Sequence, residues 1–246
     1  MRHLNTAEIL QVWEEWFNQS FLEKNLRLLA VACSVNDLHQ LSHLSIGDRD
    51  ARLLQLREWM FGYILRNKVN CPNCAEVIEW ETDTKDLHLQ SITQNLFVRE
   101  FFLEKDGYSI QFRLPDSVDI FRIAKSELQE EAYKKVRSDC ILKVNKNGEP
   151  SPASDLPESV WEALNKQMEE EDPQANIRMS LTCPTCKHSW EVYFDIGSYF
   201  WVEINNWAQR ILQEVYQLAR AFGWAERDIL NMSAYRRQYY IGMLGK

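Results

Sequence analysis

Hydrophobic residues recur at helical spacing through the first sixty residues of the chain. Ile9, Leu10 and Trp13 begin the first such pattern, which continues through Trp16 and Phe17. Further stretches of the same kind cover residues 26–33 and 48–60, and the glycine at position 62 is suited to end the last of them. The N-terminal part, residues 1–62, is therefore predicted to be a helical bundle.

The C-terminal part shows the helical pattern again. From Trp201 to Phe222, apolar residues follow one another at steps of three and four, and Gly223 then ends the run. Two short helices are expected beyond it, one around residues 229–230 and one capped by Ser233. Residues 197–246 are thus predicted to form C-terminal helices.

Between these helical parts the pattern alternates with the period of a β-strand. Ile78 and Trp80 alternate with glutamates, and so do apolar and polar residues over 177–182. The pair Asp106-Gly107 is a strong two-residue turn signal, which predicts a hairpin from about Leu96 to Leu114. The middle of the chain is therefore expected to contain antiparallel strands.

Helices are expected to follow this hairpin. Asp116 and Asp119 resemble a helix start, and helical segments are predicted to continue to Leu142. The stretch 145–157 holds three prolines and small polar residues, as expected for a surface loop, and a helix follows over 158–170.

Two Cys-Pro-x-Cys segments match each other at an offset of 112 residues. Each is followed by alternating residues typical of a strand. Two such turns facing each other make a zinc ribbon, in which four thiolates hold one structural zinc ion per chain. The predicted metal ligands are Cys71, Cys74, Cys183 and Cys186.

Other interpretations of these cysteines stay open. Each pair could be a redox site, although such sites place the first cysteine at a helix N-terminus, and here strands are expected instead. His188, two residues after Cys186, could replace a thiolate, but an exposed or supporting role is more common for such a histidine. Cys33 and Cys140 have no partner spacing and are expected to be buried small apolar residues.

The spacing of the two pairs splits the predicted ribbon. As many as 108 residues separate Cys74 from Cys183, so the ribbon comprises residues 63–83 and 176–196 and encloses an inserted hairpin and helical subdomain over 84–175. The predicted fold class is α+β and mostly helical, with terminal helices around a split four-cysteine zinc ribbon.

Composition narrows the function classes. The chain is 45% hydrophobic and 12% aromatic, as in folded proteins, and its net charge of −8 disfavours nucleic acid as a partner. No apolar run is long enough to span a membrane. The first residues lack the features of a secretory signal, so the protein is expected to be cytoplasmic, where cysteines bind metal more often than they form disulfides.

Candidate catalytic residues are not found. The sequence holds none of the common nucleophile-elbow, phosphate-loop, zinc-protease or dinucleotide-binding motifs. Zinc held by four thiolates has no open position for substrate. The protein is therefore not expected to be an enzyme.

A cluster of tyrosine and arginine residues near the C-terminus is a candidate partner surface. Residues 207–246 hold six basic and three acidic residues. Tyrosine and arginine are enriched at protein interfaces, although a helix face packed on the body of the protein would have the same composition. The candidate residues are Tyr235, Arg236, Arg237, Tyr239 and Tyr240.

Five segments together resemble zinc-ribbon proteins encoded with contractile, phage-tail-like injection systems. These segments are residues 44–62, the two Cys-Pro-x-Cys turns with residues 110–119 between them, and residues 218–240. The stretch Phe-Arg-Leu-Pro-Asp-Ser-Val-Asp is also similar to baseplate hub assembly proteins of T-even-like phages, and residues 218–240 to the ends of several tail assembly proteins. Position 75 departs from the pattern, since zinc knuckles often have glycine where this chain has alanine.

The resemblance implies a non-enzymatic baseplate component or assembly chaperone, with baseplate or tail proteins as partners. The protein could thus be cytoplasmic or incorporated in a tail-like particle. A zinc-ribbon regulator that binds nucleic acid is the alternative, and a thiol-disulfide oxidoreductase is a third hypothesis.

Overall fold

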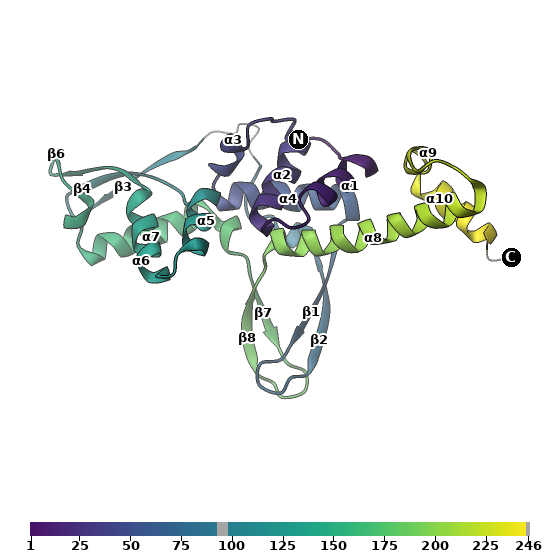
Figure 1. The fold of residues 1–246 in the computed structure, drawn as a ribbon. Helices are drawn as coiled ribbons and strands as arrows, with labels where there is room; N and C mark the ends of the chain where they lie inside the picture. The colour runs from purple at the N-terminus through teal and green to yellow at the C-terminus, as the bar shows by residue number, and fades with distance from the viewer. Residues whose placement is uncertain (93–97, 245–246) are drawn as a thin grey trace. The chain divides into compact units, whose positions relative to one another are not determined.

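The computed structural model describes residues 1–92 and 98–244. The chain divides into two compact units, one formed by Met1–Asn36 and Gly197–Lys246 and the other by Asp37–Ile196. Helices predominate and the sheets are small and antiparallel, so the predicted α+β, mostly helical class is confirmed (Figure 1). In the described part of the chain, no helix combines the length and the apolar character needed to cross a bilayer.

The first unit consists of helices from both ends of the chain. They are α1 (Thr6–Glu15), α2 (Phe21–Cys33), α8 (Ile196–Phe222), α9 (Glu226–Leu230) and α10 (Ala234–Leu244). Asn5 and Ser20 start α1 and α2 with capping boxes, in which Glu8 and Glu23 return the hydrogen bond. The first helix ends before Trp16 and Phe17, which the sequence pattern had placed inside it.

One apolar cluster packs α1 and α9 against α8. Residues one helical turn apart on α8 face Leu10 of α1 and Ile229 of α9, as predicted for the apolar seam of a long amphipathic helix. Its buried members are Leu10, Ala208, Ile211, Val215, Leu218 and Ile229. The indole of Trp13 also donates a hydrogen bond of 3.1 Å to the side chain of Asn205 on α8.

The second unit begins with α3 (Leu38–Ser42) and α4 (Ile46–Phe61). Ser45 caps α4 by accepting a hydrogen bond from the amide of Asp48. Gly62 follows the helix with a positive φ of 86°, which confirms the predicted stop.

A four-stranded antiparallel sheet occupies the insert. Its order is β3 (Glu100–Lys105), β4 (Tyr108–Arg113), β5 (Ile141–Lys146) and β6 (Glu149–Pro150). Asp106 and Gly107 both have positive φ, as a tight two-residue hairpin requires, so this predicted turn is confirmed. The predicted start of the hairpin at Leu96 lies outside the described residues.

The sequence interpretation was wrong at the end of this sheet. Helices were predicted to continue to Leu142, but α6 (Gln129–Asp139) ends earlier and β5 follows. The stretch 145–157 was predicted to be a loop, yet its first residues pair with β6 across the turn Asn147-Gly148, which also has positive φ at both residues. The stretch contains a second hairpin turn that its composition obscured, and the first strand of this hairpin, β5, pairs with β4 on its other edge.

The sheet packs against α7 (Glu158–Glu171). Alternate residues of β4 and one face of α7 form a buried core, which explains the strict alternation in the strand. The core consists of Tyr108, Ile110, Phe112, Leu114, Val144, Leu156, Val160, Trp161 and Leu164. Between β4 and β5, Asp116 starts α5 (Ser117–Lys125) with a capping box that includes Asp119, as predicted.

The remaining elements of this unit are two hairpins and three short 3-10 helices. The hairpins are β1 (Ile64–Asn70) with β2 (Val77–Asp83), and β7 (Arg178–Thr182) with β8 (Ser189–Tyr193). The 3-10 helices cover Thr84–Leu87, Ala153–Asp155 and Pro173–Asn176. The first strand, β1, has no counterpart among the elements predicted from the sequence.

Candidate metal centre

Each Cys-Pro-x-Cys segment forms the tip of one of these two hairpins. Asn70 pairs with Val77 at the end of the first ladder, and Thr182 pairs with Ser189 at the end of the second. The hairpins lie side by side with their tips together (Figure 1). Segments more than a hundred residues apart in sequence therefore meet at one place.

The two tips have the same backbone geometry. In the first, the amide of Cys71 donates to the carbonyl of Glu76 at 2.8 Å, and the amide of Ala75 donates to the carbonyl of Cys71 at 2.9 Å. In the second, the amide of Cys183 donates to the carbonyl of His188 at 2.8 Å, and the amide of Lys187 donates to the carbonyl of Cys183 at 3.0 Å. Each tip is a closed turn that holds its first cysteine at a fixed place.

Both tips contain a left-handed residue at the same position. Ala75 has a φ of 59° and Lys187 a φ of 60°, although neither is a glycine. The left-handed conformation expected after the second cysteine of a zinc knuckle is therefore present, and alanine at position 75 adopts it. This backbone conformation carries a cost for any residue with a Cβ.

The four sulfur atoms lie within 4.8 Å of one another. The Sγ atoms of Cys71 and Cys186 are 3.6 Å apart, and so are those of Cys74 and Cys183. A disulfide requires about 2.05 Å, so these pairs are not bonded to each other. Zinc–sulfur bonds of about 2.3 Å in a tetrahedron place the sulfurs about 3.8 Å apart, and the observed separation fits that geometry.

Burial divides the four cysteines into an inner and an outer pair. Cys71 and Cys183, the first cysteine of each tip, are buried, whereas Cys74 is exposed and Cys186 is half-buried. Solvent therefore reaches the second cysteine of each tip but not the first.

The thiols differ strongly in acidity. The pKa of Cys186 is lowered to about 6, mainly because the side chain of Asn73 and the amide of His188 donate hydrogen bonds to its sulfur. A hydrogen bond from the amide of Glu76 lowers the pKa of Cys74. Hydrogen bonds with the neighbouring sulfurs together have the larger, opposite effect, and the pKa of this thiol is raised to about 12. Four thiolates so close together need a cation, and zinc is suited to four sulfur ligands.

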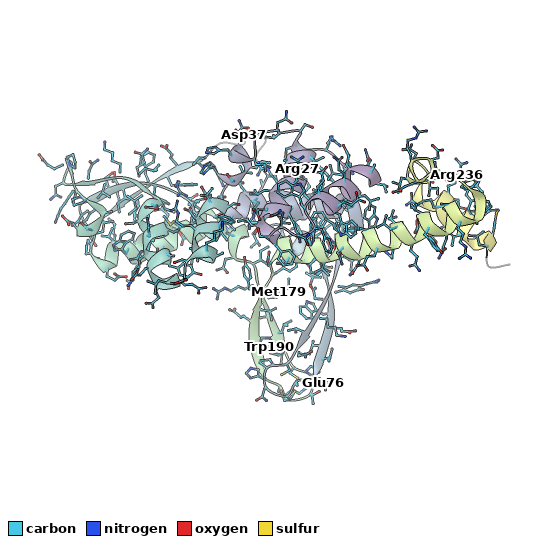
Figure 2. All side chains as sticks on the ribbon, viewed as in Figure 1. Arg27, Asp37, Glu76, Met179, Trp190 and Arg236 are labelled. Atoms are coloured by element: carbon cyan, nitrogen blue, oxygen red, sulfur yellow. The ribbon has the colours of Figure 1, made fainter. Side chains whose placement is uncertain are left out.

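His188 and the remaining cysteines lie outside the sulfur cluster. The ring of His188 stacks on that of Trp190, with 5.8 Å between centroids, and Trp190 lies near the end of its hairpin (Figure 2). Cys33 is half-buried on α2. Cys140 is fully buried as predicted, and burial raises the pKa of its thiol to about 12.

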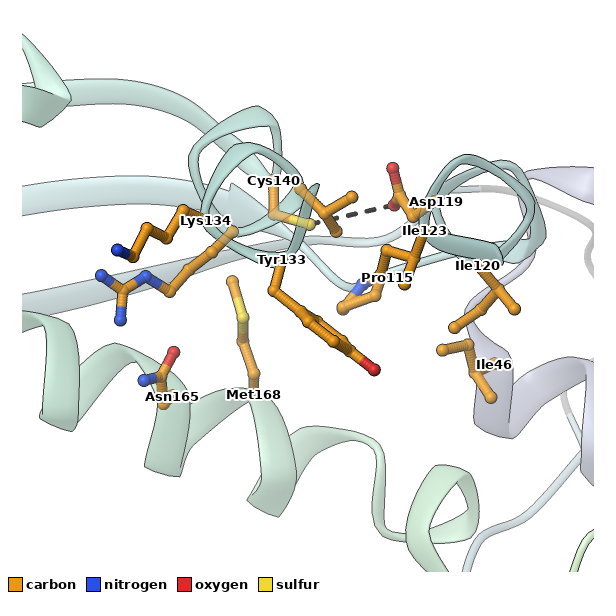
Figure 3. Close-up of a pocket in the computed structure, with 12 residues that line it drawn as sticks. Ile46, Pro115, Asp119, Ile120, Ile123, Tyr133, Lys134, Cys140, Asn165 and Met168 are labelled. Atoms are coloured by element: carbon orange, nitrogen blue, oxygen red, sulfur yellow. Dashed lines mark hydrogen bonds between the residues drawn. The ribbon is translucent and has the colours of Figure 1, made fainter. Parts of the chain in front are cut away.

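An apolar groove beside Cys140 is a feature that the sequence interpretation missed. Its volume is about 380 Å³, and α5, α6 and α7 contribute most of its lining (Figure 3). Ile120 and Tyr133 line it and remain exposed, while the thiol of Cys140 lies 4.0 Å from the carboxylate of Asp119. The apolar stripes of α5 and α6 carried a signal for it, but only the tertiary structure brings them together.

The residues of the candidate partner surface lie on α10 and differ in their surroundings. Tyr235 and Tyr239 are exposed and stack on each other at 6.5 Å. Arg236 lies over the ring of Tyr240, which also packs edge-on against Trp224. Arg237 is buried and pairs with Glu214 of α8 at 2.8 Å, so it fixes α10 rather than facing outward.

The sequence was compared with known protein families, with curated proteins and with solved structures. The family described as T4 bacteriophage base plate protein matches residues 18–201. The match includes both cysteine segments and the whole insert, whereas α9 and α10 lie outside it. Neither the curated proteins nor the solved structures gave a match. Because the family covers most of the chain, the protein belongs to the T4 bacteriophage base plate protein family.

Proposed function

We propose that the protein is a non-enzymatic component of the baseplate of a contractile, phage-tail-like system, held together by one structural zinc ion per chain. Membership of a base plate family supports the baseplate role. The observation that carries the zinc assignment is the meeting of four cysteine sulfurs from two hairpin tips within 4.8 Å. Cys71, Cys74, Cys183 and Cys186 are the ligands.

The hairpins have few other means of holding their tips together. Along β7 and β8 the residues alternate between exposed and half-buried, and β2 has no fully buried residue. Only Leu65 is fully buried in β1, near the base of its hairpin. Zinc therefore takes the place of an apolar core at the tips.

The expected contribution of the metal is large. Structural zinc stabilises zinc-finger peptides by about 10–16 kcal/mol, which matches or exceeds the free energy of unfolding of an ordinary domain. Here the ion would close a loop of 108 residues between Cys74 and Cys183. It would fix both ends of the insert, residues 84–175, and we propose the division into 1–62, the split ribbon, the insert and 197–246 on that basis.

The surroundings of the cysteines disfavour the redox alternative. Redox-active Cys-x-x-Cys pairs place their first cysteine at a helix N-terminus, which lowers its pKa. Here the first cysteine of each pair, Cys71 or Cys183, lies in a turn between two strands. A regulator that binds nucleic acid remains as the second hypothesis, and it predicts retention on DNA or RNA that weakens with salt.

We propose Tyr235 and Tyr239, with Arg236 and Tyr240 beside them, as the surface that contacts another baseplate or tail protein. Two exposed aromatic rings on one helix face, next to an arginine, have the composition of an interface centre. Arg237 would act indirectly, because its ion pair with Glu214 holds α10 against α8. A Tyr235→Ala and Tyr239→Ala double variant should lose its partner and remain folded.

Native mass spectrometry of the protein isolated from its own cells tests the proposal. The expected result is one zinc ion per chain that a chelator or Cys183→Ser removes, together with co-purifying baseplate proteins. Cys33→Ser is the matched control, since Cys33 lies outside the cluster. A zinc-free protein with reactive thiols would exclude the metal assignment.

The same experiment separates a permanent component from an assembly chaperone. A component is found in finished particles at a fixed ratio to other baseplate proteins. A chaperone binds the same partners in assembly intermediates and is absent from finished particles.

A further inference from the structure

Two histidines at the end of one short helix place their Nε2 atoms against each other. His39 lies on α3 and His43 directly after it, four residues later. Their Nε2 atoms are 3.2 Å apart, and the ring centroids lie 4.4 Å apart with an interplanar angle of 66°. Neither side chain belongs to the four-cysteine cluster or to the proposed partner surface.

A buried carboxylate fixes the orientation of the second imidazole. Nδ1 of His43 lies 2.7 Å from Oδ2 of Asp116, whose side chain is only 2% exposed. The other oxygen of Asp116 accepts hydrogen bonds from the amides of Val118 and Asp119 at the start of α5. Because the carboxylate accepts, Nδ1 of His43 carries a proton, and in the neutral ring Nε2 then presents a lone pair toward His39.

We propose that His39 and His43 form a binding site for a divalent transition-metal ion, with Asp116 as the residue that positions His43. Imidazole nitrogen suits nickel, copper and zinc. Bonds of about 2.0–2.1 Å to one ion place two nitrogens about 3.3 Å apart in a tetrahedron and about 2.9 Å apart in an octahedron. The observed 3.2 Å lies between these values.

The site requires little rearrangement to accept an ion. His43 already has the tautomer that a ligand needs, and a carboxylate on the second ring nitrogen is the usual support for a metal-binding histidine. His39 only has to carry its proton on Nδ1 instead of Nε2. Its side chain is exposed and that of His43 is 33% exposed, so water or a side chain of another protein can complete the coordination.

An ion at this place would stabilise a weak element. The helix α3 has only five residues, too few to be stable without other contacts. Bridging residues four apart would fix its turn and, through Asp116, tie it to the start of α5. The inference is independent of the zinc in the cysteine cluster, because the two sites share no residue.

Calorimetric titration with Ni²⁺ tests this site on the full chain already loaded with zinc. All variants carry His3→Gln, which removes an imidazole outside the site. We expect one nickel ion per chain, and either His39→Gln or His43→Gln should weaken binding by about tenfold or more. His88→Gln is the matched control, because the imidazole of His88 lies elsewhere, beside Glu58.

Two further readouts make the result decisive. Nickel should raise the melting temperature of the His3→Gln protein and not that of the His39→Gln variant, because only a bound ligand stabilises the folded state. Thiolate-to-nickel charge-transfer absorption would reveal binding at the cysteines instead, which would overturn the histidine site and leave the four-cysteine site intact. The histidine site would also be overturned if the variants without His39 or His43 bound nickel as tightly as the protein that retains both. It would be overturned as well if the protein with both histidines bound no nickel.

Discussion

The backbone amide of Gly47 donates a hydrogen bond of 3.0 Å to the buried carboxylate of Asp172, 125 residues later in the chain. The hydroxyl of Ser45 donates to the other oxygen of the same carboxylate, also at 3.0 Å. Asp172 directly follows α7, so the end of that helix supplies an anion to the start of α4. The position suits an anion, because the N-terminus of a helix carries free amides and a partial positive charge.

Gly47→Ala should destabilise the protein by about 1–3 kcal/mol, as is typical of overpacking in a tight core. A Cβ at this position would lie 2.2 Å from Oδ1 of Asp172 and 3.0 Å from the amide nitrogen of Ala175. The carboxylate would have to move away from the helix start and lose its hydrogen bonds. Urea unfolding followed by circular dichroism measures the change.

Gly242→Ala is the control for this variant. Nothing lies within 4 Å of a Cβ at that position, and the residue is inside α10. Alanine should therefore leave stability unchanged or raise it by up to about 1 kcal/mol. Equal stability of the two alanine variants would show that the contact between Gly47 and Asp172 is loose.

Asp119→Asn should cost about 1–3 kcal/mol near neutral pH, since Arg113 loses its close, bidentate partner and keeps only the longer 3.6 Å ion pair with Asp116. Two nitrogens of the Arg113 guanidinium lie 2.6 Å and 3.1 Å from the two oxygens of Asp119. Burial acts to raise the pKa of Asp119, but the guanidinium outweighs it and the pKa lies below its usual value. The pair therefore contributes stability above the ordinary carboxyl range and loses it as the pH falls through the lowered pKa.

The pH dependence provides the measurement for this pair. The difference in unfolding free energy between wild type and Asp119→Asn should shrink steadily as the solution is acidified. Arg122→Ala is a suitable comparison, because Arg122 is 41% exposed and lies 3.8 Å from the same carboxylate. It should cost less than about 1 kcal/mol, as most exposed ion pairs do. A pH-independent difference would contradict the assignment.

Ala75→Gly should stabilise the zinc-loaded protein by about 0.5–1 kcal/mol. A φ of 59° strains alanine, whereas glycine adopts this conformation without strain. The strain energy that is relieved exceeds the additional conformational entropy that glycine loses on folding. Glu76→Gly, one residue later, lacks that strain and should destabilise the protein slightly. Thermal unfolding of both variants tests the sign, and a destabilised Ala75→Gly protein would show that the strain is absent.

Removal of the proposed zinc ion should loosen the hairpins before the sheet of the insert. We expect chelation to raise hydrogen exchange in β1–β2 and β7–β8, because their tips have no apolar core. Ile110 and Phe112 in β4 should stay protected, since both are fully buried against α7. Uniform loss of protection would mean that the zinc holds the whole unit, and no change would exclude its structural role.

The local parts of the fold were predictable from the sequence. The turn at Asp106-Gly107, the cap at Asp116 and the stop at Gly62 depend on residues that are close neighbours in the chain, and all three are confirmed. The missed turn at Asn147-Gly148 is also a local signal, whereas the wrong assignment of the strand before it depended on pairing with a distant strand. Residues 141–146 form β5 because they pair with the free edge of β4, although their composition favours neither helix nor strand strongly.

The sequence by itself determined the helical ends, the alternating strands and the four cysteines, because periodicity and spacing are properties of the chain alone. The matched cysteine turns also predicted that the two pairs meet, as they do in the structure. Only the tertiary structure decided that Asp172 lies at the start of α4 and that His39 faces His43 beside Asp116. The path of the intervening chain fixes these contacts. The residues next to each contact do not determine that path, because a contact between distant segments depends on how the whole intervening chain packs.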